Sequence, residues 1–159
     1  ECIHHIPLII YWPGVTPASG VSEAMLYNVD LSATLCDLLD ASMPAEWDGC
    51  SFRAQLEGQQ REGRPYLVWD CALYAVQRAV RTPTHLMIRT YDPGEYDFAP
   101  LALYDMQADP YQTTNLAAEE PDLVQAYSSL LADWVVQQQA RDGWPVDPLF
   151  EVLRERTDT

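Results

Sequence analysis

The most regular pattern in this sequence is an apolar stripe near its C-terminal end. The stripe follows Pro121 and comprises Leu123, Ala126, Tyr127, Leu130, Leu131, Trp134 and Val135. Spacings of three and four residues place these side chains on one face of an α-helix. Proline is favoured in the first turn of a helix, where its missing N–H leaves no hydrogen bond unmade. Because the stripe is wide, we expect the helix over 121–139 to cover a sheet.

Four short segments ahead of this helix have the composition of strands. They are Tyr66–Trp69, Ala75–Arg81, Leu86–Tyr91 and Leu101–Tyr104, and turn residues separate them. Strands joined by such short connections usually pair with their neighbours in sequence. The pattern therefore predicts a C-terminal subdomain at residues 59–142, in which the 121–139 helix packs on a four-stranded antiparallel sheet. Residues 143–159 are predicted to be a tail.

The N-terminal third of the chain has a different pattern. Residues 6–12 are a continuous apolar run that ends at Pro13-Gly14, which is typical of a strand buried on both faces of a parallel sheet. Asp30 is a suitable N-cap for a helix at 31–40. This helix has an apolar stripe of Leu31, Leu35, Leu38 and Leu39. We expect residues 1–58 to be the end of an α/β domain.

The charge of the chain excludes two classes of partner. It has 24 acidic residues against nine arginines, no lysine and a formal net charge of -15. Nucleic-acid binding requires basic residues that displace phosphate counterions, and anionic membrane surfaces also attract basic segments. The sequence therefore predicts no nucleic-acid partner and no membrane partner. It assigns no cellular compartment.

Five short motifs, in order, resemble the C-terminal portion of the sulfatase family, within the alkaline-phosphatase-like superfamily. The resemblance covers roughly residues 1–140. Its motifs are P-L-I-x-x-W-P-G at 7–14, D-L-x-x-T-L at 30–35, D-G-x-S with L-x-G behind it at 48–58, Arg81-Thr82, and L-Y-D-x-x-x-D-P with N-L behind it at 103–116. In the second motif Ala33 replaces the family's usual proline, and in the last Gln112 replaces its usual glutamate.

The resemblance implies a fold class for the whole chain. The implied fold is α/β, or α+β for this chain in isolation. Residues 1–58 would be the terminal part of an alkaline-phosphatase-like α/β/α domain, and the antiparallel subdomain would follow it. The stretch at 103–117 is interpreted as scaffold, because Asp105, Asp109 and Asn115 can bond nearby backbone N–H groups.

The resemblance implies the chemistry of sulfatases, whose nucleophile is a formylglycine made from the Cys or Ser of a C/S-x-P-x-R motif. It also implies a divalent metal, calcium or magnesium, in the full-length protein. The cysteines of this chain, Cys2, Cys36, Cys50 and Cys71, do not stand in such a motif. We therefore expect neither nucleophile nor metal site in this chain, no catalytic residue, and no activity of the chain alone. The implied partners are a missing N-terminal catalytic part and, for the full enzyme, a small-molecule sulfate ester.

Two residues are candidates for the rim of a substrate site. His4 and His5 stand directly before the predicted strand, and either could contact a sulfate group. The alternative interpretation is that they are ordinary histidines in a connection. The acids Asp92, Glu95 and Asp97 lie in a Pro-Gly turn, where spaced carboxylates are more often solvated than metal-binding.

Three functions remain open from the sequence. The first is the C-terminal fragment of a sulfatase-type sulfuric ester hydrolase, which braces the active-site domain and lines the substrate mouth. The second is a fragment of a phosphonate or phosphodiester hydrolase of the same superfamily, and the third is a free-standing, non-catalytic interaction module. Because the 6–12 strand would lose its neighbours in isolation, we expect the isolated chain to self-associate.

Overall fold

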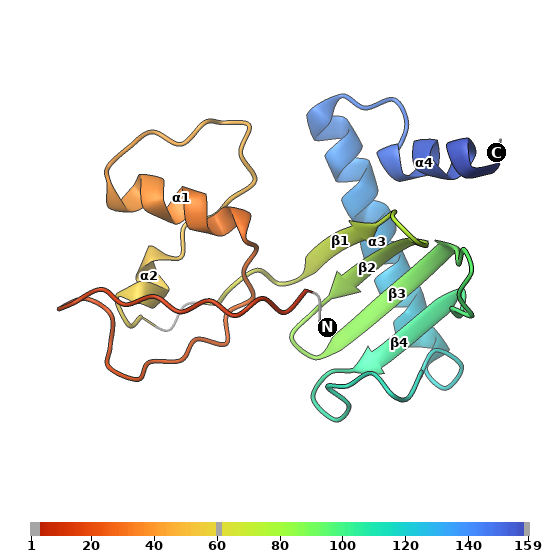
Figure 1. The fold of residues 1–159 in the computed structure, drawn as a ribbon, viewed down its shortest axis with the longest axis horizontal. Coiled ribbons are helices and arrows are strands. Elements are labelled where there is room, and N and C mark those ends of the chain that lie inside the picture. The colour runs from red at the N-terminus through yellow and green to blue at the C-terminus, as the bar shows by residue number, and fades with distance from the viewer. Residues whose placement is uncertain (1–3, 60–61, 158–159) are drawn as a thin grey trace. The chain divides into compact units, whose positions relative to one another are not determined.

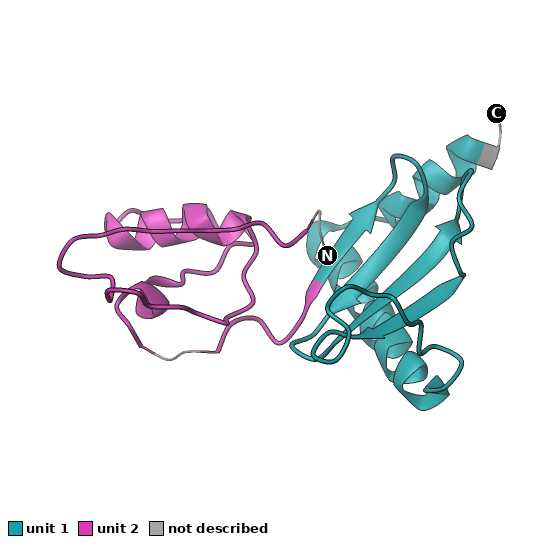
Figure 2. Ribbon diagram, turned by 60° about the horizontal axis from the view of Figure 1, so that its bottom comes forward, with its two compact units in different colours: residues 1, 68–159 teal, residues 2–67 magenta. Residues whose placement is uncertain are grey.

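The computed structural model describes residues 4–59 and 62–157 and divides into two compact units, coloured separately in Figure 2. Unit 2 is Cys2–Leu67, and unit 1 comprises Val68–Thr159 together with Glu1. The boundary between Leu67 and Val68 falls later than the predicted boundary after residue 58.

Unit 1 contains the predicted antiparallel sheet. Its strands are β1 (Leu67–Cys71), which begins one residue before the unit boundary, β2 (Val76–Arg81), β3 (His85–Asp92) and β4 (Leu101–Asp105). They lie in the order β1-β2-β3-β4, so each strand pairs with its neighbour in sequence (Figure 1). The prediction of a four-stranded meander is confirmed, with strand ends that agree to within two residues.

One face of this sheet packs against α3 (Pro121–Asp142). Met87 is paired with Val80 on one side and Leu103 on the other, and all three side chains are fully buried. The Ser128 hydroxyl of α3 lies 3.9 Å from the Met87 sulfur, which identifies this row as the helix-facing one. In Figure 1, α3 runs behind the strands. The helix therefore covers the sheet as its apolar stripe predicts.

The opposite face holds a smaller core. Side chains alternate between the two faces of a strand, so Leu86 and Ile88 point away from α3. Leu86 is buried in a cluster with Ala79 and Met106, and Trp69, Ile88 and Tyr104 pack around it. A further helix, α4 (Pro148–Thr157), ends unit 1 within the segment that was predicted to be a tail.

The 103–117 stretch is scaffold, as predicted. The Asp105 carboxylate accepts the backbone N–H groups of Gln107 and Ala108 at 2.8 and 3.0 Å. Asp109 in the same way accepts the N–H groups of residues 113 and 114 at 2.7 and 2.8 Å. Asn115 bonds the edge strand β4: its Oδ1 accepts the Leu103 N–H at 2.9 Å and its Nδ2 donates to the Leu101 carbonyl at 3.1 Å.

Asn115→Ala is expected to destabilise unit 1 by about 1–3 kcal/mol, because it leaves the Leu103 N–H without its acceptor. Urea unfolding of the purified variant measures the loss. Thr114→Ala is the matched control, since it keeps the backbone N–H to Asp109. Equal stability of the two variants would contradict a bracing role for the Asn115 amide.

Unit 2 contains two helices, α1 (Val29–Leu38) and α2 (Arg53–Leu56). The prediction that Asp30 is the N-cap is wrong: Asn28 occupies that position, and Asp30 lies buried in the first turn. Gly49 packs directly against α1. A Cβ at Gly49 would lie 2.5 Å from the Val29 carbonyl oxygen and 2.9 Å from the Ala33 Cβ, so only glycine fits this approach.

The predicted buried strand at 6–12 requires a correction. These residues form no strand and lie mostly exposed, with Ile9 at 93% exposure. A strand needs a neighbour that satisfies its backbone groups, and no described segment of the chain pairs with this one. Residues 6–12 therefore remain outside any sheet. Among the described helices, none is long and apolar enough to cross a membrane.

Candidate functional site

The two candidate histidines lie at the start of the described chain. His4 and His5 are both exposed in unit 2, and the Ile6 N–H donates to the His4 carbonyl at 3.0 Å. The third histidine, His85, belongs to unit 1, where its Nδ1 lies 2.9 Å from the Thr84 hydroxyl and its ring meets Tyr127 edge-on. The structure thus leaves His4 and His5 as surface residues beside the extended segment 6–12.

A metal site requires several donor side chains that converge on one point. Within residues 4–59 and 62–157, no three His, Cys, Asp or Glu side chains gather closely enough to hold an ion. Asp92 instead accepts the Gly94 N–H at 2.9 Å and pairs with Arg156 at 3.1 Å. These two bonds, the backbone one first, hold the pKa of Asp92 below its ordinary value. The donor groups in residues 4–59 and 62–157 therefore do not fit a divalent metal site.

The described cysteines do not fit the motif of a formylglycine nucleophile either. Cys36, Cys50 and Cys71 are free thiols, with Cys50 exposed and the other two partly buried. Cys2 lies outside the described residues. Cys50 has Arg53 behind it but no proline between them, so it does not fit the formylglycine motif.

A buried arginine in unit 1 lies between two carboxylates. The Arg78 side chain is 3% exposed and forms bidentate pairs with Asp70 and Asp147, at N···O distances of 2.6–3.0 Å. Its guanidinium carbon also lies 5.4 Å from the centroid of the Trp134 ring. Asp147 in turn accepts the Leu149 N–H at 3.1 Å, so one carboxylate both neutralises Arg78 and caps α4.

The protonation states of this cluster are fixed by its own contacts. Burial alone would lower the pKa of the Arg78 guanidinium, but its bonds to Asp70 and Asp147 outweigh burial and raise it. Burial would likewise raise the pKa of Asp147, and the bonds from Arg78 and the Leu149 N–H instead hold it below its ordinary value. Both groups stay charged near neutral pH, so neither is poised to exchange a proton.

Unit 2 has a parallel arrangement around Asp30. Its buried carboxylate accepts the N–H groups of Tyr27 and Cys50, both at 2.7 Å, and pairs with Arg64 at 2.5 Å. Burial would raise the pKa of Asp30, but the bonds from Arg64 and the two N–H groups lower it overall. Arg64 also donates to the Asp48 carbonyl at 2.7 Å. Asp30 therefore ties α1 to the 48–50 turn and to Arg64.

Both clusters are closed structural networks. Each carboxylate is engaged by a guanidinium and, for Asp30 and Asp147, also by backbone N–H groups. Sequence reasoning missed both networks, including the one around Arg78. Its one local signal is Arg78, a charged residue in the middle of the apolar strand Ala75–Val80, which requires a buried partner.

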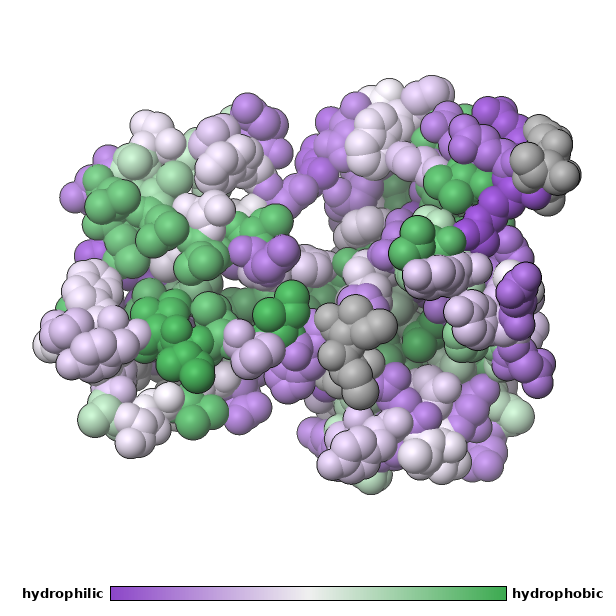
Figure 3. All heavy atoms as spheres, viewed as in Figure 1, coloured by the Kyte–Doolittle hydropathy of each residue, from purple (hydrophilic) through white to green (hydrophobic). Residues whose placement is uncertain are grey.

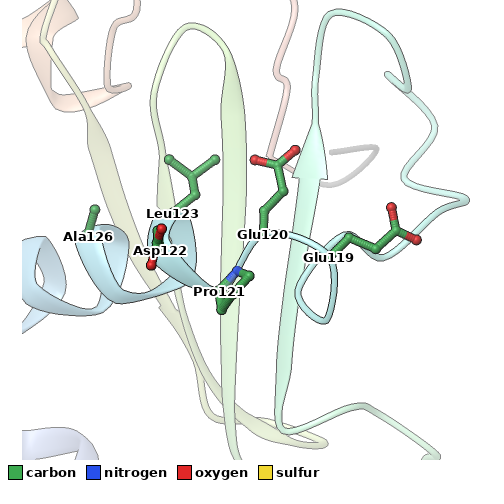
Figure 4. Close-up of a pocket in the computed structure, with 6 residues that line it drawn as sticks. All are labelled: Glu119, Glu120, Pro121, Asp122, Leu123 and Ala126. Carbon is green, nitrogen blue, oxygen red and sulfur yellow. The ribbon is translucent and has the colours of Figure 1, made fainter.

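A shallow depression of about 470 Å³ lies at the start of α3 (Figure 4). Its lining comes from one continuous stretch of chain and is acidic: Glu119, Glu120, Pro121, Asp122, Leu123 and Ala126. Figure 4 shows the carboxylates of Glu119 and Glu120 directed away from the helix. With no convergent groups from a second element, it has neither the shape nor the polar groups of a ligand site.

Comparison with known proteins places the chain among C-terminal portions of longer enzymes. Residues 1–139 match the family model described as N-sulphoglucosamine sulphohydrolase, C-terminal. The chain is 29% identical over 163 residues to an N-acetylglucosamine-6-O-sulfatase of Bacteroides thetaiotaomicron, covering 91% of this chain and 27% of that protein. It is 31% identical to a Delta 4,5-hexuronate-2-O-sulfatase of the same organism, covering 81% and 26%.

A solved structure agrees with these relatives. It is a protein in complex with its substrate D-glucosamine-2-N,6-O-disulfate, 26% identical to this chain, with a TM-score of 0.70 over 86% of this chain and 29% of that one. The chain thus spans little more than a quarter of the length of each of these three proteins.

Proposed function

The chain belongs to the sulfatase family, and from that premise we propose that it is the C-terminal part of a sulfuric ester hydrolase whose chemistry is carried by a preceding portion. The observation that carries this proposal is the match of residues 1–139 to a C-terminal sulfatase model. The chain spans only 27% of the N-acetylglucosamine-6-O-sulfatase. The remaining length of such a protein is where we place the formylglycine and the divalent metal.

The proposed role of this chain is to brace the active-site domain and to line one side of the substrate mouth. Its closed ion-pair networks support the bracing role, because the Arg78 and Asp30 clusters fix each unit internally. His4 and His5 are the residues that we propose for the substrate rim. Both are exposed, and an imidazole can donate a hydrogen bond to a sulfate oxygen.

The proposed substrate is a sulfate ester on a sugar. The relatives carry names that specify 6-O-sulfated N-acetylglucosamine and 2-O-sulfated hexuronate, and the matched structure holds a disulfated glucosamine. The phosphonate or phosphodiester hydrolase and the free-standing interaction module remain the alternatives that an experiment must separate.

The test compares the full-length protein encoded by the gene with the 159-residue chain. We expect the full-length protein to hydrolyse an aryl sulfate and a 6-O-sulfated glucosamine, and the chain alone to give no turnover above a metal-only blank. Faster hydrolysis of an aryl phosphonate or phosphodiester would favour the phosphonate or phosphodiester hydrolase. No ester hydrolysis by either protein would favour the interaction module, and turnover by the chain alone would overturn our assignment of the chemistry.

A further inference from the structure

Helix α4 depends on its contacts with the rest of unit 1. It has ten residues, and helices shorter than about 12–15 residues are marginal in water by themselves. In its first turn Leu149 is buried, and the Phe150 ring meets the Tyr91 ring of β3 edge-on, with 5.5 Å between the centroids. Asp147, directly ahead of the helix, is bonded to Arg78 of β2. The beginning of α4 is therefore fastened to the sheet.

The end of α4 is fastened by an arginine. Arg156 Nη2 donates to the carbonyls of Ala72 and Leu73 at 3.3 and 2.6 Å. Its Nη1 donates to the Tyr74 carbonyl at 3.3 Å and to the Asp92 carboxylate at 3.1 Å. Hydrogen bonds from a charged donor are roughly twice as strong as neutral ones. One guanidinium thus holds three successive carbonyls of the turn at 72–75, which joins β1 to β2.

The same turn supports the loop that joins β3 to β4. A Cβ at Gly94 would lie 2.3 Å from the Tyr74 carbonyl oxygen, so the two backbones are in direct contact. Asp92 accepts the Gly94 N–H at 2.9 Å and also bonds Arg156. Figure 1 shows the β1–β2 turn, the β3–β4 loop and α4 at one end of the sheet. In the same view, Figure 3 shows strongly hydrophilic side chains between α4 and this end, as these polar contacts require.

We propose that α4 is a latch for this end of the sheet: when it is docked it fixes the β1–β2 turn and the loop that rests on it, and its release frees both. Release and melting are coupled, because an undocked α4 is too short to keep its helical structure. The order of the two connections therefore depends on the order of the helix, which makes the latch a two-state element.

The latch opens first at its Arg156 end. The side chains of Arg156 and Asp92 are 28% and 32% exposed, so water can solvate both groups when they separate. Arg78 and Asp147 at the other end are buried, and their separation leaves charges without solvent. The inference is independent of the proposed function, since it uses contacts within unit 1 alone.

Limited proteolysis with chymotrypsin measures the state of the turn. Leu73 and Tyr74 are 71% and 66% exposed, and both are apolar residues of the kind that the chymotrypsin pocket accepts. Cleavage of a folded chain follows the population of the locally opened form. We expect Arg156→Gln to speed cleavage after these two residues about tenfold, because it removes charged hydrogen bonds to the turn. Mass spectrometry of the fragments locates the cut.

Three further variants separate the latch from a general effect of charge. Arg141→Gln is the matched control: it removes the same charge from an arginine of α3 that pairs with Asp142, and it should leave cleavage at the turn unchanged. Arg156→Lys keeps the charge but loses the planar fork, so its cleavage rate should be intermediate. Leu149→Ala loosens the beginning of α4 without altering Arg156, and it should also release the turn.

Hydrogen–deuterium exchange across residues 150–157 measures the state of the helix in the same samples. Arg156→Gln and Leu149→Ala are both expected to speed this exchange about tenfold or more, because the undocked helix does not keep its hydrogen bonds. Peptides from β3 are the internal reference, since this strand is paired on both sides, and their unchanged exchange shows that unit 1 is folded. If Leu149→Ala does not fold, Arg156→Gln and Arg141→Gln decide the question.

The proposal is overturned if Arg156→Gln leaves cleavage at the turn unchanged or if Arg141→Gln speeds it equally. It is also overturned if Leu149→Ala melts α4 while the turn stays resistant, since the turn would then keep its order without the helix. Rapid exchange of residues 150–157 in the unmodified chain would show that α4 is not docked, with the same consequence.

Discussion

Replacing Arg78 with methionine is expected to lower the free energy of unfolding of unit 1 by about 3–5 kcal/mol, because it removes one partner of a buried ion pair and leaves the others uncompensated. Asp147 is buried, and Arg78 is the cation bonded to its carboxylate at 2.6 and 3.0 Å. Asp70 contributes less to the loss, since about a third of its side chain is exposed and water can solvate it.

Urea unfolding of the chain measures the effect, with Arg141→Met as the control. Arg141 pairs with Asp142 at 2.7 Å, but about half of its side chain is exposed, and exposed pairs contribute only about 0–1 kcal/mol. The double variant Arg78→Met with Asp147→Leu should recover part of the loss, since it removes the stranded carboxylate as well. A loss from Arg78→Met no larger than that of the control would show that the pair is not the constraint we infer.

The sheet and α3 could be predicted because their signals are local. Each strand of unit 1 is a short apolar segment between turn residues, and the stripe on α3 repeats at helical spacing over more than three turns. The 103–117 stretch was likewise predictable, since Asp105 and Asp109 bond backbone N–H groups within five residues of themselves.

The ion-pair networks could not be predicted, because their partners are distant in sequence. Arg78 and Asp147 are 69 residues apart, and Asp30 and Arg64 are 34 apart. Asp147 also lies in a segment whose pattern predicted only a tail. A residue such as Asp30 gives the same local signal whether it caps a helix or is buried inside the first turn, so the sequence alone favoured the commoner arrangement.

The prediction of a strand at residues 6–12 was wrong for another reason. The apolar run at 6–12 was interpreted as a buried strand, and its side chains have that character, but strand formation depends on a neighbour. No described part of this chain supplies one. The candidate histidines belong to the same segment: His4 and His5 lie exposed at its start, and their contact with a substrate stays a prediction.

Removal of the Asp30 carboxylate is expected to affect unit 2 as strongly as the loss of Arg78 affects unit 1. Asp30→Ala leaves the Tyr27 and Cys50 N–H groups without this acceptor and leaves the partly buried Arg64 without its carboxylate. We expect a loss of about 3–5 kcal/mol, the range observed when one partner of a buried pair is deleted. The loss should appear as faster hydrogen exchange across residues 27–52, which contain α1 and the turn bonded to it.

Two further variants separate charge from hydrogen bonding at this position. Asp30→Asn keeps one carbonyl acceptor but removes the charge that pairs with Arg64, so its loss should lie between those of wild type and Asp30→Ala. Asp37→Ala, on the same helix, is the control: its carboxylate bonds the Ser51 hydroxyl and lies 3.7 Å from Arg53, but its side chain is 44% exposed. Exposed pairs of this kind contribute about 0–1 kcal/mol. If Asp37→Ala and Asp30→Ala accelerated exchange equally, the stability of unit 2 would depend on the surface of α1 rather than on its buried carboxylate.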